Sequence, residues 1–219
     1  MTNRFEHFFY NINKKLTINK WHHYFEIYDT HFKKFLNKNP VIVEIGVQNG
    51  GSLEMWNYYF EGKCKIYGLD INPKCKKLEA NFNNVTILIG DQSNDEFLDS
   101  VQKLIPQIDI LIDDGSHINS HQIKSFEKLY QNIAPDGVYL VEDLHTSYWS
   151  EFGGKLNNPD TFIEYSKKLI DNVNAFHIPN YDRTFAKTTN ALHYYDSVLV
   201  IEKKIKHTDP IQSRRGPGK

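Results

Sequence analysis

The sequence has few cysteines, no long apolar run and almost no net charge, and each shortage excludes a class of protein. Its 219 residues include only two cysteines, Cys64 and Cys75, too few for a disulfide framework. We therefore expect free thiols and a reducing, cytoplasmic location. No apolar run approaches the roughly 20 residues of a membrane-spanning helix, and the N-terminus lacks the apolar core of a secretory signal.

The charge balance excludes a further class of partner. Basic residues number 26 and acidic residues 27, for a formal net charge of -1. This balance gives no electrostatic reason to expect binding to nucleic acid or to an anionic membrane. Hydrophobic residues make up 40% of the chain and aromatic residues 14%, enough to build a core. The length fits one α/β domain.

Short apolar segments alternate with helical segments through most of the chain. Runs rich in β-branched residues predict buried strands at 40–46, 65–70, 85–91, 108–114 and 137–143. Helices are predicted near 20–37, 52–60, 95–104, 119–133 and 161–172. Two further strands are predicted, at 173–177 and, near a sheet edge, at 195–203. The alternation indicates a parallel sheet with helices on both faces.

A glycine-rich turn follows the first predicted strand and contains Gly46, Gly50, Gly51 and Ser52. Glycines let a backbone approach a ligand closely, and the helix that follows offers unpaired N–H groups. No Lys-Ser or Lys-Thr follows the glycines, so the turn is not a Walker loop, and its spacing also differs from G-x-G-x-x-G. A plain tight turn between strand and helix is the alternative interpretation.

Acidic residues stand at or near the carboxyl ends of all five strands. They are Glu44, Asp70, Asp91, Asp113, Asp114, Glu142 and Asp143. In open parallel sheets, ligands bind outside these ends. Asp70 lies where an acid can accept hydrogen bonds from a ribose, although a helix cap is the alternative. Asp91 and Gln92 either present polar groups to an adenine edge or form an ordinary turn.

Two pairs of acids, Asp113–Asp114 and Glu142–Asp143, follow two neighbouring predicted strands. Carboxylate oxygens at close quarters suit Mg²⁺, and without a cation they would raise each other's pKa. His117 lies three residues after Asp114. Its side chain could equally well act as a general base for a hydroxyl or form a structural hydrogen bond.

The remaining histidines give weaker signals. His145 follows the second acid pair and is a candidate for facing a substrate. His31 is expected at the surface. No spacing of cysteines and histidines indicates zinc.

Several of these segments match one known family in order. They are VEIGVQNGGSLEMW, IYGLDINP, IGDQ, LIDDGSH and VYLVEDLHTSYW, which span about residues 41–154. The chain resembles class I S-adenosylmethionine-dependent methyltransferases. More narrowly, it resembles the metal-dependent sugar O-methyltransferases of the mycinamicin macrolide type. The glycine turn and Asp70 are typical of the whole superfamily, whereas DDGSH together with EDxxTxYW is more specific.

The resemblance implies a Rossmann-like fold with a mostly parallel seven-stranded sheet, helices on both faces and an antiparallel last strand. We expect a methyltransferase domain over residues 39–205, preceded by a helical extension at 1–38. The polar tail at 206–219 is expected to be flexible. Macrolide members of the family carry a further domain where this chain has about 40 residues. Their quaternary structure is therefore not expected to transfer, and a homo-oligomer stays open.

The resemblance also implies roles for individual residues. The methyl donor would be bound by Glu44, Gly46, Gly50, Ser52, Asp70, Asp91, Gln92 and Asp113. Asp114, Glu142 and Asp143 would bind Mg²⁺, and His117 would act as the general base. His145, Tyr148 and Trp149 would shape the acceptor pocket.

The expected function is therefore transfer of a methyl group from S-adenosylmethionine to a sugar hydroxyl. The expected acceptor is a small molecule, a sugar nucleotide or a glycan, in surface-polysaccharide or glycosylated-metabolite biosynthesis rather than on a macrolide. A catechol-like O-methyltransferase and a non-catalytic cofactor-binding scaffold stay open as alternatives. Some family relatives have an oxygenase-associated role. The predicted ligands are all oxygen atoms and lack the two histidines of a typical iron site, which argues against such a role here.

Overall fold

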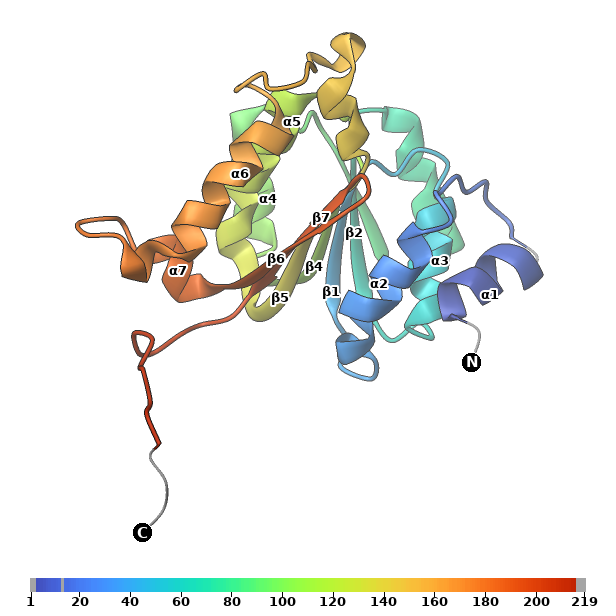
Figure 1. Ribbon diagram of the computed structural model, residues 1–219. Helices are drawn as coiled ribbons and strands as arrows, with labels where there is room; N and C mark the ends of the chain where they lie inside the picture. The colour runs from blue at the N-terminus through green and yellow to red at the C-terminus, as the bar shows by residue number, and fades with distance from the viewer. Residues whose placement is uncertain (1–2, 13, 216–219) are drawn as a thin grey trace.

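The computed structural model of the protein describes residues 3–12 and 14–215. A seven-stranded sheet lies at its centre, with helices on both faces (Figure 1). The strand order is β3-β2-β1-β4-β5-β7-β6. The first five strands pair in parallel, and β7 runs antiparallel to both β5 and β6. This topology confirms the predicted sheet and its antiparallel last strand.

The strands are β1 (Val41–Ile45), β2 (Lys65–Asp70), β3 (Val85–Ile89), β4 (Ile108–Asp113), β5 (Ile133–Val141), β6 (Thr189–Tyr195) and β7 (Val198–Lys203). The α-helices are α1 (Arg4–Asn11), α2 (Tyr24–Phe32), α3 (Gly51–Tyr59), α4 (Asp95–Leu104), α5 (Asn119–Leu129), α6 (Phe162–Val173) and α7 (Thr184–Thr188). Short 3-10 helices include η2 (Pro73–Asn81) and η4 (Leu144–Tyr148). Five strands and five helices thus lie near their predicted positions.

The last third of the chain differs from the prediction in two ways. The strand predicted at 173–177 is wrong, because α6 continues to Val173 and a 3-10 turn covers Ala175–His177. The sixth strand is instead β6, which is only partly buried and therefore lacks a strong apolar pattern. The strand predicted at 195–203 is confirmed as β7, but it lies inside the sheet and β6 forms the edge.

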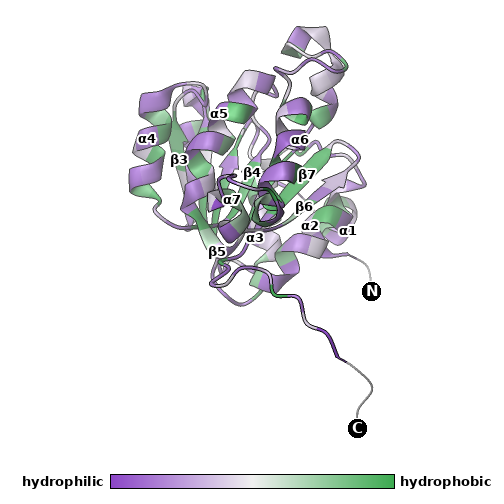
Figure 2. Ribbon diagram, turned by 60° about the vertical axis from the view of Figure 1, so that its left-hand side comes forward, coloured by the Kyte–Doolittle hydropathy of each residue, from purple (hydrophilic) through white to green (hydrophobic). Residues whose placement is uncertain are grey.

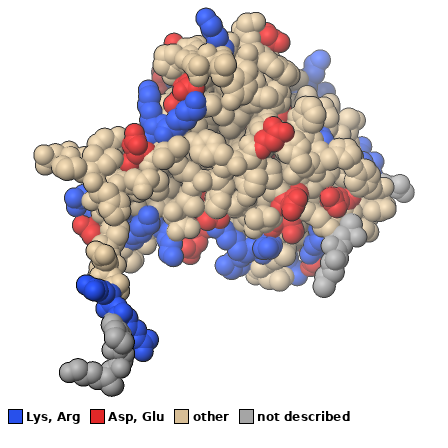
Figure 3. Space-filling view, viewed as in Figure 1, with Lys and Arg blue, Asp and Glu red and all other residues tan. Residues whose placement is uncertain are grey.

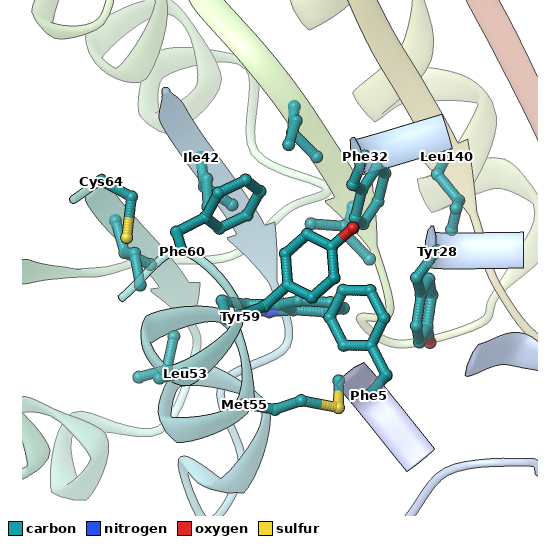
Figure 4. Packing of buried hydrophobic residues seen from close by; sticks show 14 of the residues in the cluster. Phe5, Tyr28, Phe32, Ile42, Leu53, Met55, Tyr59, Phe60, Cys64 and Leu140 are labelled. Carbon is teal, nitrogen blue, oxygen red and sulfur yellow. The ribbon is translucent and has the colours of Figure 1, made fainter. Parts of the chain in front are cut away.

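The segment before β1 belongs to the core. Helices α1, α2 and α3 cover one face of the sheet, and α4, α5 and α6 cover the other (Figures 1 and 2). Phe5 of α1 is fully buried and stacks on Tyr59, with ring centroids 3.9 Å apart. Its ring also meets the edge of Trp56, and Figure 4 shows it among the apolar side chains of this face. The first helix therefore packs as an integral part of the fold.

Other sequence expectations concern the thiols, membranes and charge. Cys64 and Cys75 are both free, as expected, and both are buried. Among the described residues, no helix has the length and apolar character needed to cross a bilayer. Acidic and basic side chains are interspersed on the face shown in Figure 3. The predicted boundaries of the methyltransferase domain, at residues 38 and 205, stay a prediction. Positions 1–2 and 13 of the N-terminal extension and 216–219 of the tail lie outside the described residues.

Replacing Phe5 with alanine tests whether α1 is part of the core. We expect Phe5→Ala to lower the free energy of unfolding by about 3–5 kcal/mol, because it opens a cavity between two aromatic rings. Tyr10→Ala is the control on the same helix, since Tyr10 is 56% exposed and its loss should cost less than about 0.5 kcal/mol. Urea unfolding measures both. Equal effects of the two substitutions would contradict the packing described for α1.

Candidate active site

Two cavities meet at the carboxyl ends of the parallel strands. The larger, of about 520 Å³, lies between the glycine turn after β1 and the ends of β2, β3 and β4. The smaller, of about 450 Å³, lies at the ends of β4 and β5, against residues 19–24. Asn19, Asp114 and Asp143 line both cavities. The strand ends therefore bring two binding spaces into contact, as expected for an open parallel sheet.

The glycine turn forms one wall of the larger cavity. Gly46 has a φ of 95°, and a Cβ at this position would lie 2.0 Å from the carbonyl oxygen of Asp114. Only glycine fits there. Asp70 lines the cavity and holds the turn, because its Oδ2 accepts the N–H groups of Val47 and Gln48 at 2.9 Å each. Asp91 lines the cavity as well.

Glu44 lies buried beneath this turn. Its carboxylate accepts hydrogen bonds from Ser52 Oγ at 2.8 Å and from Trp56 Nε1 at 3.0 Å. Burial raises the pKa of Glu44 to about 7, although the nearby ammonium group of Lys20 acts to lower it. Gly46, Gly50 and Ser52 line a small recess of about 30 Å³ beside the larger cavity.

Gln92 and Asp113 form a buried network behind the larger cavity. Gln92 lines the cavity, but its Oε1 accepts the N–H of Ser116 at 2.7 Å and its Nε2 donates to Asp113 Oδ1 at 3.3 Å. Asp113 is fully buried, and burial raises its pKa to about 7. It lines none of these spaces, whereas the next residue, Asp114, lines all of them. The expected contact of Asp113 with a cofactor is therefore replaced by a role in holding this loop.

The acid cluster, defined as Asp114, Glu142 and Asp143, lines the smaller cavity together with Lys20. The Lys20 ammonium contacts Asp114 Oδ2 and donates to Glu142 Oε2 at 2.7 Å. The lysine side chain is only 3% exposed. Burial alone would lower the pKa of Lys20, but the two carboxylates outweigh it and hold that pKa well above its usual value. A positive charge thus stands among the predicted metal ligands.

Two tyrosines of α2 bind two further oxygens of the acid cluster. Tyr24 donates to Asp143 Oδ1 at 2.7 Å, and Tyr28 donates to Glu142 Oε1 at 2.6 Å. The two side chains are one helical turn apart, so they share a face of α2. Burial and the neighbouring Asp114 raise the pKa of Glu142 to about 8, although Lys20 and Tyr28 act in the opposite direction. Three carboxyl groups share this cavity with one ammonium group, and a further cation would relieve the repulsion between the carboxylates.

His117 faces the acid cluster across a gap. Its Nε2 lies 3.8 Å from Asp114 Oδ1 and 3.6 Å from Asp143 Oδ2, too far for good hydrogen bonds. Donor atoms of His117, Asp114 and Asp143 all lie within 4.8 Å of one another. The carboxylates of Asp114 and Asp143 at this spacing fit a divalent cation, with His117 next to it. Glu142, the third predicted ligand, lies in the same cavity but is held by Lys20 and Tyr28.

Aromatic side chains gather at the smaller cavity. His145 lines it and lies between two indoles, with ring centroids 6.0 Å from Trp21 and 4.6 Å from Trp149. Trp21 lines the cavity and is 54% exposed. Tyr148 and Trp149 are both about half-exposed and line neither cavity, so their positions differ from the predicted ones in the acceptor pocket. Trp149 adjoins the smaller cavity only through its contact with His145.

Comparisons with known proteins agree with this geometry. No family model matches the chain. It is 35% identical to the 8-demethyl-8-alpha-L-rhamnosyl tetracenomycin-C 2'-O-methyltransferase of Streptomyces olivaceus, over 84% of this chain and 52% of that protein. It is 36% identical to the mycinamicin VI 2''-O-methyltransferase of Micromonospora griseorubida, over 80% of this chain and 47% of that protein.

The chain is also similar in structure to a solved methyltransferase. The MycE methyltransferase of the mycinamycin pathway, in complex with Mg, SAH and mycinamycin VI, superposes with a TM-score of 0.78 and 32% identity. The match covers 92% of this chain and 54% of that one. The chain is a homologue of sugar O-methyltransferases. It has their class I methyltransferase fold and spans about half the length of the relatives that it matches.

In this methyltransferase homologue, most of the predicted site residues gather where the strands end. Four residues that matter there were missed by the sequence analysis: Lys20, Trp21, Tyr24 and Tyr28. All four come from the segment before β1, whose path across the strand ends has no local sequence signal. The helical spacing of Tyr24 and Tyr28 was the one available hint.

Replacing Lys20 with methionine tests its electrostatic role. Lys20→Met leaves buried carboxylates without their cation, so we expect a loss of about 3–5 kcal/mol in the free energy of unfolding without metal. Added Mg²⁺ should restore more stability to this variant than to the wild type. Lys15→Met, in the same segment but at an exposed position, is the control. Urea unfolding with and without Mg²⁺ measures the effect, and equal stability of the two variants would refute it.

Proposed function

We propose that the protein is an S-adenosylmethionine- and Mg²⁺-dependent O-methyltransferase acting on a sugar hydroxyl of a glycosylated small molecule. One observation carries the proposal: Asp114 and Asp143 line both cavities. A donor in the larger cavity and an acceptor in the smaller one would therefore meet at the acid cluster. The relatives named for sugar O-methylation support this reaction class.

The larger cavity is the proposed donor site. Gly46 permits close approach of the methionine part, and the recess formed with Gly50 and Ser52 adjoins it. Asp70 would accept hydrogen bonds from the ribose with its remaining lone pairs. Asp91 and Gln92 would lie near the adenine, while Glu44 would support the turn from below.

The acid cluster is the proposed metal site, held in place by Lys20, Tyr24 and Tyr28. When bound, Mg²⁺ lowers the pKa of an acceptor hydroxyl. His117 Nε2 faces the two aspartates and would take the proton of that hydroxyl, and their charges would stabilise the imidazolium. The acceptor oxygen then bonds to the methyl carbon as the carbon–sulfur bond breaks, releasing S-adenosylhomocysteine.

The rim of the smaller cavity supports a sugar acceptor. Trp21 and Trp149 flank His145 with partly exposed rings, against which the apolar face of a sugar would pack. A glycosylated metabolite is favoured by the relatives, since two of them are named for a rhamnosyl tetracenomycin and an L-olivosyl-oleandolide. A polysaccharide acceptor and a cytoplasmic location have no such support and stay predictions.

An acceptor screen with and without metal tests the proposed function. We expect methyl transfer from S-adenosylmethionine to rhamnosyl or related glycosides, loss of transfer in EDTA, and its return with Mg²⁺. Transfer to catechol alone would indicate the aromatic alternative. Binding of S-adenosylhomocysteine without transfer to any diol would indicate a cofactor-binding scaffold.

Replacing His117 with alanine tests the base. We expect kcat to fall by about 10²-fold or more, as for a lost general base, with affinity for S-adenosylhomocysteine nearly unchanged. His145→Ala, at the acceptor side, should raise KM more than it lowers kcat. Undiminished turnover of the His117→Ala variant would remove this residue from the mechanism.

A further inference from the structure

We infer that His31, His193 and Glu202 form a second metal site, suited to Zn²⁺ or a similar transition-metal ion. We call these three residues the hairpin site. They lie between α2 and the β6–β7 hairpin and line neither of the two strand-end cavities. The inference stands on their geometry alone and does not depend on the proposed methyl transfer.

The fold brings the three residues together from distant parts of the chain. In the β6–β7 pairing, Ala191 is opposite Glu202 and His193 is opposite Val200. His193 and Glu202 are therefore diagonal neighbours on one face of the hairpin. Helix α2 packs over this face, and His31 lies on the same side of α2 as Tyr28.

The donor atoms of the three residues lie close to one another, although the two histidines face different oxygens of Glu202. His31 Nδ1 lies 3.0 Å from Glu202 Oε1, and His193 Nε2 lies 3.6 Å from Glu202 Oε2. All three donors fall within 4.8 Å of one another. Zn²⁺ binds nitrogen and oxygen at about 2.0–2.2 Å, so ligands at the corners of a tetrahedron are roughly 3.3–3.6 Å apart. Small rotations of the side chains would complete such a site.

Two polar atoms support a ligand at this position. His193 Nε2 is buried and has no hydrogen-bond partner among the residues that the structure describes. His31 Nε2 lies 2.9 Å from the hydroxyl of Tyr195. With a metal on Nδ1, the Nε2–H of His31 would donate to that hydroxyl, as metal-bound histidines usually donate to a neighbouring acceptor. His193 is 36% exposed, which leaves a path for the ion to enter.

The donor set decides which ion fits. Two imidazole nitrogens and one carboxylate suit Zn²⁺, whereas Mg²⁺ prefers oxygen ligands throughout. Three protein ligands leave one position for water. An ion here would fasten the end of α2 to the sheet. The same helix carries Tyr24 and Tyr28, which hold Asp143 and Glu142.

Zinc titration of the full chain tests the hairpin site. In excess Mg²⁺ and against a competing chelator, we expect the wild type to bind Zn²⁺ at this site with a stoichiometry of one. His193→Gln and Glu202→Gln should each weaken that binding by more than about 10-fold, and Tyr195→Phe by about 10-fold or more. The control His207→Gln, at an exposed position near the start of the tail, should leave it unchanged. Circular dichroism checks that each variant folds.

Binding at the acid cluster must be distinguished from binding at the hairpin site. Asp114→Asn weakens the acid cluster only, so it should preserve the Zn²⁺ assigned to the hairpin. Co²⁺ in place of Zn²⁺ should give the strong visible absorption of a tetrahedral ion in the wild type and in Asp114→Asn, but not in His193→Gln. No bound Zn²⁺ in the wild type, or Zn²⁺ lost in Asp114→Asn alone, would overturn the inference and leave a hydrogen-bonded cluster.

Discussion

Buried negative charge at the ends of β4 and β5 is the constraint on which the rest of the site depends. Asp114, Glu142 and Asp143 share one cavity, where carboxylates ionise at a cost unless cations or hydrogen-bond donors compensate them. Lys20 supplies one positive charge and two tyrosines supply donors. Asp114 and Asp143 line both cavities, so a divalent ion bound to them would lie beside the proposed methyl donor.

The same constraint explains why the segment before β1 is packed into the core. Helix α2 presents Tyr24, Tyr28 and His31 along one side, and each contacts an acid of the sheet. Removing this helix would expose the acid cluster to water and leave Asp143 Oδ1 and Glu142 Oε1 without their tyrosine donors. The match to the sugar O-methyltransferases covers about half of their length. The activity of those longer proteins is therefore proposed for this chain.

Sequence reasoning located the sheet and the acids because both have local signals. Runs of β-branched residues indicate the strands. Acids at the carboxyl ends of parallel strands lie at the same edge of the sheet, so their proximity follows from the strand assignment alone. Contacts between distant segments have no such signal: Lys20 and Asp114 are 94 residues apart. His31 was expected at the surface, yet it is buried against the β6–β7 hairpin, and β6 itself was missed because half of its side chains face outward. Asp113 was grouped with Asp114, although Asp113 bonds to buried Gln92 behind the larger cavity and only Asp114 lines that cavity.

A crystal of the protein grown with Mn²⁺ and S-adenosylhomocysteine would test the central claim most directly, because Mn²⁺ replaces Mg²⁺ at oxygen-rich sites and scatters X-rays anomalously. The account predicts an anomalous peak at bonding distance from carboxylates of the acid cluster, next to the sulfur atom of the nucleoside in the larger cavity. A nucleoside bound elsewhere, or an acid cluster that keeps Lys20 and takes no Mn²⁺, would contradict it.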